Sequence, residues 1–487
     1  MFVGILTWLG LILPVFFSFF WPSFVAVYIL LFDLYWVLRA FYMSNYLRLS
    51  YIKMKRALHT NYRQVLEAIE IKEGDPKWQE VYQVVMFATF REELDTLLPS
   101  VQSVVDADWP NQKVIIMLAG EESDAERLDH NASFLKEKFK GKIFDFIYSK
   151  HPSDIIGEVR GKGAGSAWAG RRLSEYVSSK GIDESKVLVT IADADTRFHR
   201  QYFNAICCEF LKNPDRHRRT YQPIPLYSNN IWYAPTISRL AAWGSSFWQM
   251  IEASRPWRLV NFSTHSYSLK MLREMDYWDA TVVNEDSRQF WRAYFAFDGN
   301  HKAVPIYIPV YMDAVVGESL SVSLGNLYKQ KRRWAYGVEH LPYIVTESIK
   351  NKKIPFWDKW CKIFRLVQGS YDWVVASMHL MFVGWLPIIF SESFRTTVLA
   401  YNYPDIARII LSIAWLAAIM SVYTSLSFLP PRPRGFGKMK YFEMVADWIV
   451  TPLSAIFFSS IPALEAQTRL MLGKYMGFWV TPKKSVK

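Results

Sequence analysis

Residues 188–196 read Leu-Val-Thr-Ile-Ala-Asp-Ala-Asp-Thr, an apolar run that ends in two carboxylates, Asp193 and Asp195. Such a run is typical of a buried strand, and polar residues at its carboxyl end project into the crevice of an α/β sheet. Two acids this close can share a divalent cation, because Mg²⁺ usually takes one or two carboxylates together with substrate phosphates. An ordinary turn after a strand is the alternative, since Asp is common there. The residues downstream favour the metal site.

A regular alternation of patterns around this stretch predicts the fold. Short apolar runs at residues 83–89, 113–118, 142–147 and 186–191 indicate strands, and residues 92–105 and 167–180 have helical periodicity. Strands that alternate with helices predict a mostly parallel, doubly wound α/β sheet. Ligands of such sheets bind beyond the carboxyl ends of the strands, where we expect Asp193, Asp195, Glu121 and Glu122.

The composition indicates a soluble domain joined to membrane spans. Of the 487 residues, 51% are hydrophobic and 21% are charged, which suits neither an ordinary soluble enzyme nor a pure bundle of membrane helices. The net charge of +12 lies largely beside apolar segments, so it indicates a lipid bilayer and no nucleic acid. The three cysteines, Cys207, Cys208 and Cys361, have neither metal-ligand spacing nor a disulfide pattern, which favours a reducing compartment.

Residues 2–43 predict a transmembrane hairpin. They are almost entirely apolar and are interrupted at Trp21-Pro22-Ser23, so they fit two spans of about 20 residues each. The lack of a charged leader and of a small-residue cleavage site favours an anchor over a signal peptide. Basic residues then place the next segment in the cytoplasm, and they are Arg48, Lys53, Lys55 and Arg56.

The C-terminal region predicts further spans at residues 373–390 and 406–428, with residues 391–405 outside and the basic residues 430–440 in the cytoplasm. Residues 444–464 form another apolar segment. A single crossing there would leave Lys474, Lys483 and Lys484 outside, against the charge rule, so a second short crossing or a re-entrant hairpin is an open alternative. The expected domains are a transmembrane hairpin (1–45), a cytoplasmic domain with interfacial helices (46–350) and a C-terminal transmembrane region (351–487).

Two further segments carry candidate chemistry. The glycine-rich residues 161–165 precede a helix and can cradle phosphate, with Lys162 supplying charge; a flexible loop before a helix is an equal alternative. Residues 281–286 form a second apolar run, which ends in the adjacent acids Glu285 and Asp286. Like charges raise a carboxyl pKa, which suits a general base. Equally, these residues can be the cap and first-turn acid of a helix over residues 287–294.

A basic, aromatic helix is expected over residues 324–348 and contains Gln330-Lys331-Arg332-Arg333-Trp334. Arginine offers a planar fork for phosphate, and tryptophan offers a flat face for a sugar. An interfacial helix lying against the membrane is the alternative, and both can hold. Residues 229–250, rich in Trp, Tyr and Ala, predict another buried or membrane-facing helix.

The order of these motifs between two sets of spans resembles the membrane-embedded family 2 glycosyltransferases of the cellulose, hyaluronan and chitin synthase type. The resemblance covers roughly residues 80–340 and implies a GT-A (Rossmann-like) fold, a nucleotide-sugar donor and Mg²⁺ or Mn²⁺. Asp193 and Asp195 then match the metal and diphosphate motif. Asp286 matches the catalytic base, with Glu285 beside it as a second catalytic candidate. The clamp on the diphosphate and the acceptor is matched by Gln330, Arg333 and Trp334.

The chain departs from the family pattern at three places. Where the family often reads Pro-Thr-Tyr-Asn-Glu, residues 88–92 read Ala-Thr-Phe-Arg-Glu, so Thr89 and Glu92 are the substrate-binding candidates of that loop. Glu121 and Glu122 replace an Asp pair against the nucleotide base, and glutamate can still accept a hydrogen bond from a uracil imide. Asn284 replaces the Thr that usually precedes the Glu-Asp pair.

The resemblance implies an inverting enzyme that builds a β-linked polysaccharide from a nucleotide sugar. We expect the donor to be a UDP-sugar and the enzyme to be a multi-pass protein of the plasma (inner) membrane. Polar residues of the spans, such as Asp372, Trp373, Ser377, His379 and Ser460, are candidates for a path for the polymer; bonding between helices is the alternative for each. Two other functions stay open: transfer of one sugar to a lipid-phosphate or lipid-linked acceptor, and a catalytically inactive membrane scaffold or channel.

Overall fold

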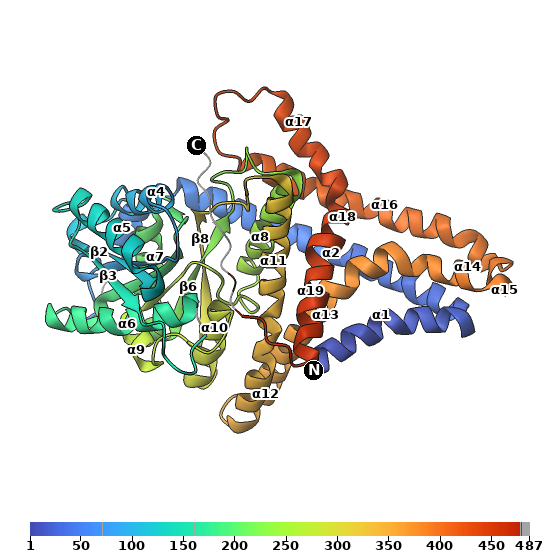
Figure 1. Cartoon of the computed structure of the whole chain (residues 1–487), viewed down its shortest axis with the longest axis horizontal. Coiled ribbons are helices and arrows are strands. Elements are labelled where there is room, and N and C mark those ends of the chain that lie inside the picture. The colour runs from blue at the N-terminus through green and yellow to red at the C-terminus, as the bar shows by residue number, and fades with distance from the viewer. Residues whose placement is uncertain (71, 160, 478, 480–487) are drawn as a thin grey trace.

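The computed structural model describes residues 1–70, 72–159, 161–477 and 479. Figure 1 shows a sheet with helices on both faces and, beside it, a group of long helices that extends away from the sheet. One continuous helix, α2 (Pro22–His59), joins the two parts. Its second half packs on the sheet-containing part, where Leu47 and Met54 are buried. Residue 45, the expected domain boundary, therefore falls inside a helix.

The sheet has eight strands in the order β3-β2-β1-β4-β7-β6-β8-β5. The first four run parallel, β6 pairs parallel to β8, and β7 and β5 pair antiparallel to their neighbours. The sheet is therefore mixed, with parallel pairing in the half that the sequence predicted. The strands are β1 (Tyr82–Ala88), β2 (Val114–Glu121), β3 (Asp145–His151), β4 (Val187–Asp193), β5 (Arg197–Phe198), β6 (Arg219–Leu226), β7 (His265–Ser268) and β8 (Lys302–Tyr311).

Alternate residues of the central strands face two separate cores. In β1, Val85 and Phe87 face the core formed with α4, α5 and α7, whereas Val84 and Met86 face the core formed with α6, α9 and α10. Burial on both faces explains why the parallel strands are continuous apolar runs in the sequence. The covering helices are α4 (Leu94–Val105), α5 (Ala125–Lys138), α6 (Lys162–Ser179), α7 (Tyr202–Lys212), α9 (Leu269–Glu274) and α10 (Glu285–Ala296); α3 (Tyr62–Glu67) lies against α7.

Three predicted elements differ from the structure. The helix expected over residues 324–348 is two α-helices, α11 (Leu320–Ala335) and α12 (Leu341–Lys350), because a 3-10 helix over Tyr336–His340 separates them. The helix expected over residues 229–250 is α8 (Thr236–Ala253), since a turn precedes it. The strand expected at residues 142–147 is shifted to β3.

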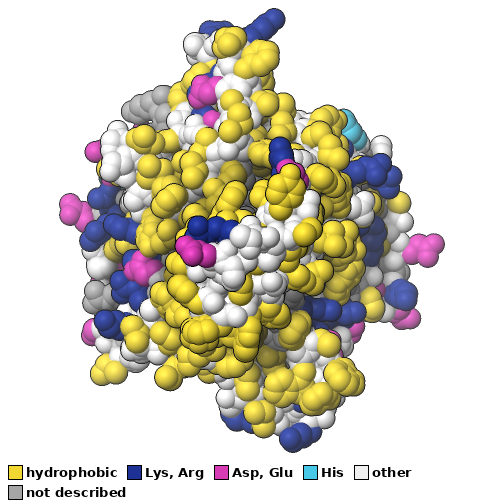
Figure 2. All heavy atoms as spheres, turned by 90° about the vertical axis from the view of Figure 1, so that its right-hand side faces the viewer, with side chains coloured by type: hydrophobic (Ala, Val, Ile, Leu, Met, Phe, Trp, Pro, Cys, Tyr) yellow, Lys and Arg dark blue, Asp and Glu magenta, His cyan; other side chains and the backbone are white. Residues whose placement is uncertain are grey.

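Among the described residues, five helical segments are long and apolar enough to cross a membrane: Phe2–Phe20, Pro22–His59, Phe356–Phe390, Val398–Ser427 and Met439–Met471. Figure 2 views the molecule from the side of these helices and shows large hydrophobic patches. Such patches suit contact with lipid, so the helices indicate membrane association. Their helical pieces are α1 (Phe2–Phe20), α2, α13 (Phe356–Phe382), α14 (Leu386–Phe390), α16 (Val398–Ser427), α17 (Met439–Ala446), α18 (Thr451–Ala455) and α19 (Ile461–Met471). The short helix α15 (Glu392–Arg395) lies between the third and fourth segments.

The last apolar segment runs in a different direction from the other four. In Figure 1, α1, α2, α13 and α16 extend to the right, whereas α17, α18 and α19 run from top to bottom beside the sheet-containing part. There α19 packs against α11: Glu465 Oε1 lies 2.6 Å from Arg332, and the Tyr328 hydroxyl donates to Glu465 Oε2 at 2.8 Å.

The described part of the C-terminal tail stays near α11. The N–H of Met476 lies 3.4 Å from the hydroxyl oxygen of Tyr336, and the ammonium of Lys329 lies 5.4 Å from the ring centre of Trp479. Lys474 belongs to this tail, whereas Lys483 and Lys484 lie outside the described residues.

Several polar residues of the spans bond to other helices. Asp372 pairs with Arg39 of α2, Trp373 Nε1 donates to Ser459 at 2.8 Å, and the Ser377 hydroxyl lies 2.6 Å from that of Ser460. His379 Nε2 lies 3.0 Å from the Gly10 carbonyl oxygen of α1. These contacts correspond to the alternative that such residues join helices.

Candidate active site

A cavity of about 380 Å³ lies beyond the carboxyl ends of β1, β2 and β4. It brings together residues that are far apart in the sequence, because α6, α10 and α11 all reach its wall. Glu122 differs: it is exposed, and its carboxylate accepts the N–H of Ser153 at 3.2 Å. The other expected site residues all line the cavity, and they are Thr89, Glu92, Glu121, Lys162, Asp193, Asp195, Glu285, Asp286, Gln330, Arg333 and Trp334.

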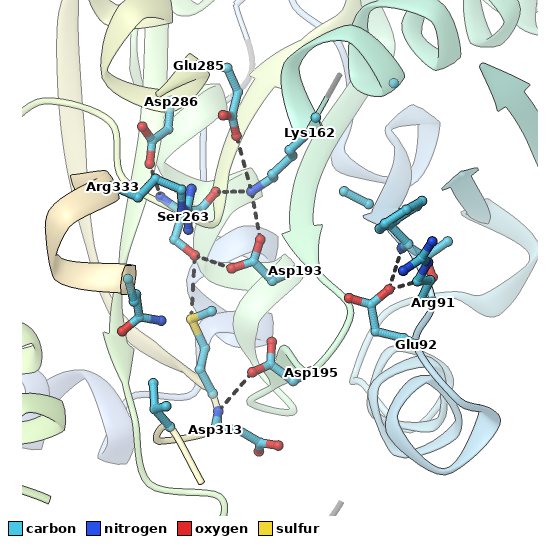
Figure 3. Close-up of a pocket in the computed structure, with 18 of the residues that line it drawn as sticks. Arg91, Glu92, Lys162, Asp193, Asp195, Ser263, Glu285, Asp286, Asp313 and Arg333 are labelled. Atoms are coloured by element: carbon cyan, nitrogen blue, oxygen red, sulfur yellow. Dashed lines mark hydrogen bonds and ion pairs between the residues drawn. The ribbon is translucent and has the colours of Figure 1, made fainter. Parts of the chain in front are cut away.

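The two aspartates at the end of β4 face this cavity (Figure 3). Asp193 is the last residue of the strand, and its two oxygens accept hydrogen bonds from Lys162 Nζ at 2.9 Å and from the Ser263 hydroxyl at 3.0 Å. Asp195 Oδ2 accepts the N–H of Asp313 at 3.1 Å. The apolar run thus ends at the cavity, and the polar side chains at its end line that cavity, as the sequence predicts.

Lys162 begins α6 and lies between two acids. Its ammonium donates to Asp193 and to the Ser263 carbonyl at 3.1 Å, and it lies 3.8 Å from Glu285 Oε1. Burial disfavours the charged amine, but the attraction of Asp193 and Glu285 outweighs it and raises the pKa of Lys162. The cation therefore offsets the repulsion between carboxylates that meet in one cavity.

Glu285 and Asp286 are the first residues of α10. Asp286 Oδ1 accepts the N–H of Ser287 at 2.7 Å, as a first-turn acid does, while Oδ2 accepts the N–H of Ser263 at 2.9 Å. Burial, together with the neighbouring Asp286 charge, raises the pKa of Glu285 to about 7 although Lys162 opposes the shift. These two acids therefore occupy the first turn of a helix and also line the cavity, so both interpretations of the sequence hold together.

The three residues of the Gln-x-x-Arg-Trp motif lie on one face of α11, because positions i, i+3 and i+4 of a helix are neighbours. The ring of Trp334 packs edge-on against Phe262, with 5.6 Å between ring centres, and Lys331 Nζ lies 4.5 Å from the Trp334 ring centre. Asn284 Nδ2 donates to the Arg333 carbonyl at 3.0 Å. This bond ties the end of α11 to the start of α10.

The loop after β1 is closed by Glu92. Its carboxylate accepts the Thr89 hydroxyl at 3.0 Å and also the N–H of Phe90. Arg91, which lies between them in the chain, has a φ of 64° and lines the cavity. Glu92 is thus a loop-shaping residue, while Thr89 and Arg91 reach the cavity from the loop.

The family model described as glycosyl transferase family group 2 matches residues 188–428, which include Asp193, Asp195, Asp286 and Arg333. The chain is a family 2 glycosyltransferase. The cavity of this glycosyltransferase is therefore its candidate active site. No protein with a curated function matches the sequence.

Two solved structures resemble the glycosyltransferase in part. One is the mannosyltransferase PcManGT from Pyrobaculum calidifontis in complex with GDP-Man and Mn²⁺, at 12% identity and a TM-score of 0.41, covering 89% of this chain and 100% of that chain. The other is residues 1–349 of S. aureus TarS in complex with UDP-GlcNAc, at 13% identity and a TM-score of 0.35, covering 81% and 93%.

Ser263 and Asp313 are among the cavity residues of the glycosyltransferase that were not predicted from its sequence. Ser263 touches Asp193 through its hydroxyl and Asp286 through its N–H. Asp313 comes shortly after β8, just as Asp193 stands at the end of β4. An acid after an apolar run is therefore a signal by which the sequence could have predicted Asp313. Nothing comparable marks Ser263, which lies in an irregular segment before the short strand β7.

The residues present fit a divalent cation that is shared with a substrate. Among the residues that the structure describes, no group of three or more His, Cys, Asp and Glu side chains is placed to hold a metal by itself. Asp193 and Asp195 supply two carboxylates to one cavity. A pair of carboxylates completed by phosphate oxygens is a usual Mg²⁺ site in proteins, and Mn²⁺ also prefers oxygen ligands.

Proposed function

We propose that this glycosyltransferase moves a sugar from a nucleotide-sugar donor to an acceptor hydroxyl with inversion at the anomeric carbon. One observation carries the proposal: Ser263 contacts both Asp193 and Asp286. The expected diphosphate-binding acid and the expected base are therefore joined through a single residue. A donor whose diphosphate lies at Asp193 would then present its sugar toward Asp286.

Each residue has a role in that reaction. Asp286 takes the proton of the acceptor hydroxyl while the hydroxyl oxygen attacks the anomeric carbon. In the same step, the bond from that carbon to the diphosphate oxygen breaks, and the diphosphate leaves. Arg333 stabilises the charge on the departing diphosphate, because guanidinium binds phosphate in a planar, two-pronged way. A single displacement of this kind inverts the anomeric carbon, so an α-linked donor gives a β-linked product.

Asp193 and Asp195 are the residues that would hold Mg²⁺ or Mn²⁺. When bound, the cation neutralises part of the negative charge on the leaving diphosphate. Lys162 offsets the negative charge of Asp193 and Glu285, and Gln330 and Trp334 orient the substrates on the α11 side. Thr89, Glu92 and Glu121 complete the donor side of the cavity, and Glu122 remains a predicted binding residue at its edge.

The acceptor in this proposal is a growing polysaccharide, as in the cellulose, hyaluronan and chitin synthase type. The position of Trp334 beside the helical part supports it, because a sugar chain leaving the cavity stacks on flat aromatic faces. The proposed arrangement has a GT-A domain in the cytoplasm, with the hairpin and the C-terminal spans in the plasma (inner) membrane.

A second candidate acceptor is a lipid phosphate or lipid-linked sugar, which receives one residue. The contacts of the spans favour this candidate: Asp372, Trp373, Ser377 and His379 bond to other helices instead of lining a path. A catalytically inactive scaffold is disfavoured because the acids and Arg333 line one cavity.

Purified protein incubated with a panel of radiolabelled nucleotide sugars, with Mg²⁺, Mn²⁺ or EDTA, tests the reaction. We expect metal-dependent release of a nucleoside diphosphate and a product whose new linkage has the opposite anomeric configuration to the donor, read by NMR. Retention of configuration, or no transfer from any donor, contradicts the proposal.

Reconstitution in sealed vesicles with the cytoplasmic domain outside separates the two acceptors. A processive synthase gives long product that an added glycanase cannot fully degrade until detergent is added. Label that extracts into organic solvent with one sugar per lipid favours the second candidate instead.

A further inference from the structure

A buried histidine beside the donor cavity lies between two carboxylates. His151 ends β3, and its side chain is only 4% exposed. Its Nδ1 lies 2.9 Å from Glu121 Oε2, and its Nε2 lies 2.7 Å from Glu158 Oε2. Neither His151 nor Glu158 has a role in the reaction proposed above.

The two partners of His151 require a definite protonation state. An ionised carboxylate only accepts hydrogen bonds, so each ring nitrogen must carry a hydrogen when both acids are ionised. Burial alone would lower the pKa of His151, but the bonds and charges of Glu121 and Glu158 outweigh it and raise that pKa. Helix α6 also packs against the ring, through the uncharged Trp168, whose ring lies edge-on with 6.2 Å between ring centres.

The strand pairing explains how Glu121 and His151 meet. β2 and β3 are adjacent parallel strands, and Glu121 and His151 are register partners at their carboxyl ends. Glu158 reaches the ring from the segment that leads to α6. Three separate parts of the chain thus converge on one imidazole ring.

The second oxygen of Glu121 is on the cavity side of this arrangement. Glu121 lines the cavity, and a Cβ placed on Gly165 of α6 would lie 3.2 Å from its Oε1. Because Gly165 has no side chain, it leaves room for this oxygen beside α6 in the lining of the cavity, while Oε2 is held by His151. A carboxylate fixed in this way presents one acceptor oxygen to a ligand in a defined direction.

We propose that His151 and Glu158 are positioning residues that hold Glu121 as an ionised, oriented acceptor for the imide N–H of the donor's nucleobase. The inference rests on the proposed function, because it assumes that the cavity binds a nucleotide sugar. Uracil presents one imide N–H, whereas cytosine and adenine present a ring-nitrogen lone pair there, which a carboxylate repels. Guanine presents two adjacent N–H donors, which suit a carboxylate with both oxygens available.

The test compares His151→Gln and Glu158→Gln with wild type, and His130→Gln, an exposed histidine of α5, is the matched control. Glutamine at position 151 removes the charge and has its N–H donors on one nitrogen only, so it cannot donate to both acids from two separate nitrogens as the imidazolium does. We expect His151→Gln to raise the donor KM roughly tenfold at nearly unchanged kcat, since a bond to a charged group typically contributes that much. The preference for UDP over CDP in calorimetry with Mn²⁺ should fall by a similar factor, and His130→Gln should match wild type.

A pH profile separates positioning from a merely structural role. In wild type, the donor KM should rise as the pH passes upward through the raised pKa of His151, because the neutral ring can bond to only one acid. In Glu158→Gln, that rise should move to lower pH, since one of the charges that favour the imidazolium is gone. Because Glu158 is at the surface side of the ring, with 21% of its side chain exposed, this variant also serves if His151→Gln does not fold.

Three results overturn the inference. The first is an unchanged KM and UDP/CDP ratio in both folded variants. The second is an equal loss for every nucleotide, with the pH profile unmoved. The third is a wild-type preference for GDP over UDP, which leaves the glycosyltransfer proposal intact. If the wild type binds no nucleoside diphosphate at all, both this inference and the proposed function fail.

Discussion

Ser263 is the residue at which the two halves of the active site meet. Its hydroxyl donates to Asp193 and its N–H donates to Asp286, while its backbone has a φ of 49°, which a non-glycine residue seldom adopts. Such conformations persist where surrounding contacts hold them, and they are frequent at functional sites. The two hydrogen bonds to the acids are contacts of this kind.

At the residue scale, Asp286→Asn tests the proposed base. Asparagine has the same shape and can still accept one of the two N–H bonds, from Ser263 or from Ser287, so the fold and donor binding should survive. Transfer should fall by about 10²–10⁴-fold, the usual contribution of a general base. The measurement is the initial rate at saturating donor, together with the Kd for the nucleoside diphosphate. A rate within about threefold of wild type would leave Asp286 with a structural role only.

The charge on His151 also predicts how stability depends on pH. Its folded-state pKa is raised above the usual histidine value of 6.5, so its contribution to stability is fully present below that value and is lost as the pH rises through the folded pKa. The difference in melting temperature between wild type and His151→Gln should therefore shrink from acidic to alkaline pH. A difference that grows toward alkaline pH contradicts the assigned direction.

At the element scale, the first turn of α6 is packed closely against the loop before α10. A Cβ on Gly163 would lie 2.7 Å from the Asp279 carbonyl oxygen and 3.0 Å from Glu285 Cβ. Gly163→Ala should therefore destabilise the fold by about 1–3 kcal/mol, as overpacking does. Transfer should also fall, because Lys162 and Glu285 must shift.

Gly325→Ala is the matched control, because this glycine of α11 has open space around its Cβ position. Alanine there should stabilise the helix by about 0.5–1 kcal/mol, the usual gain over glycine. Denaturant melts in detergent, read by tryptophan fluorescence, compare the two variants. Equal stability of both alanine variants would mean that the α6 contact is not tight.

The strands that the sequence predicted well are those whose buried residues are mostly apolar. β1 and β4 are covered on both faces, so their apolar runs mark them directly. β7 reads His-Ser-Tyr-Ser and is fully buried, so its polar residues conceal it. β8 contains Pro305 and Pro309, which argue against a strand in a sequence.

Prediction of the site is limited in the same way, because a sequence shows local patterns and not contacts between distant residues. Asp193, Asp195 and Asp286 follow apolar runs and could be found locally, and the resemblance to a known family supplied Gln330 and Trp334. Ser263 and His151 act through partners far away in the chain, at 70 residues from Asp193 and 30 residues from Glu121. A single sequence carries no local sign of such contacts.

At the scale of the whole molecule, the direction of α17–α19 bears on the membrane topology. This segment runs beside the sheet-containing part in Figure 1, and the described tail stays near α11. The N-terminus is on the same side, since the Thr7 hydroxyl of α1 donates to Gln467 of α19 at 2.7 Å. We therefore expect four crossings and an interfacial last segment, which keeps Lys474 in the cytoplasm and satisfies the charge rule.

Cysteine labelling checks this topology. In a Cys361→Ser background, which removes the exposed thiol, Lys474→Cys and Ser393→Cys are treated with a membrane-impermeant maleimide in right-side-out cells. We expect label at position 393 only, with position 474 reacting after the membrane is opened. Labelling of position 474 in intact cells would mean that the last segment crosses.

The central claim is that Asp193 and Asp195 bind a cation together with the donor's diphosphate, in the cavity where Asp286 acts. The most direct measurement is calorimetry of UDP binding with and without Mn²⁺, in wild type and in Asp195→Asn. We predict that Mn²⁺ tightens UDP binding to wild type by roughly tenfold or more, and that Asp195→Asn, although folded, loses most of that gain. The same gain from Mn²⁺ in both proteins would contradict the account.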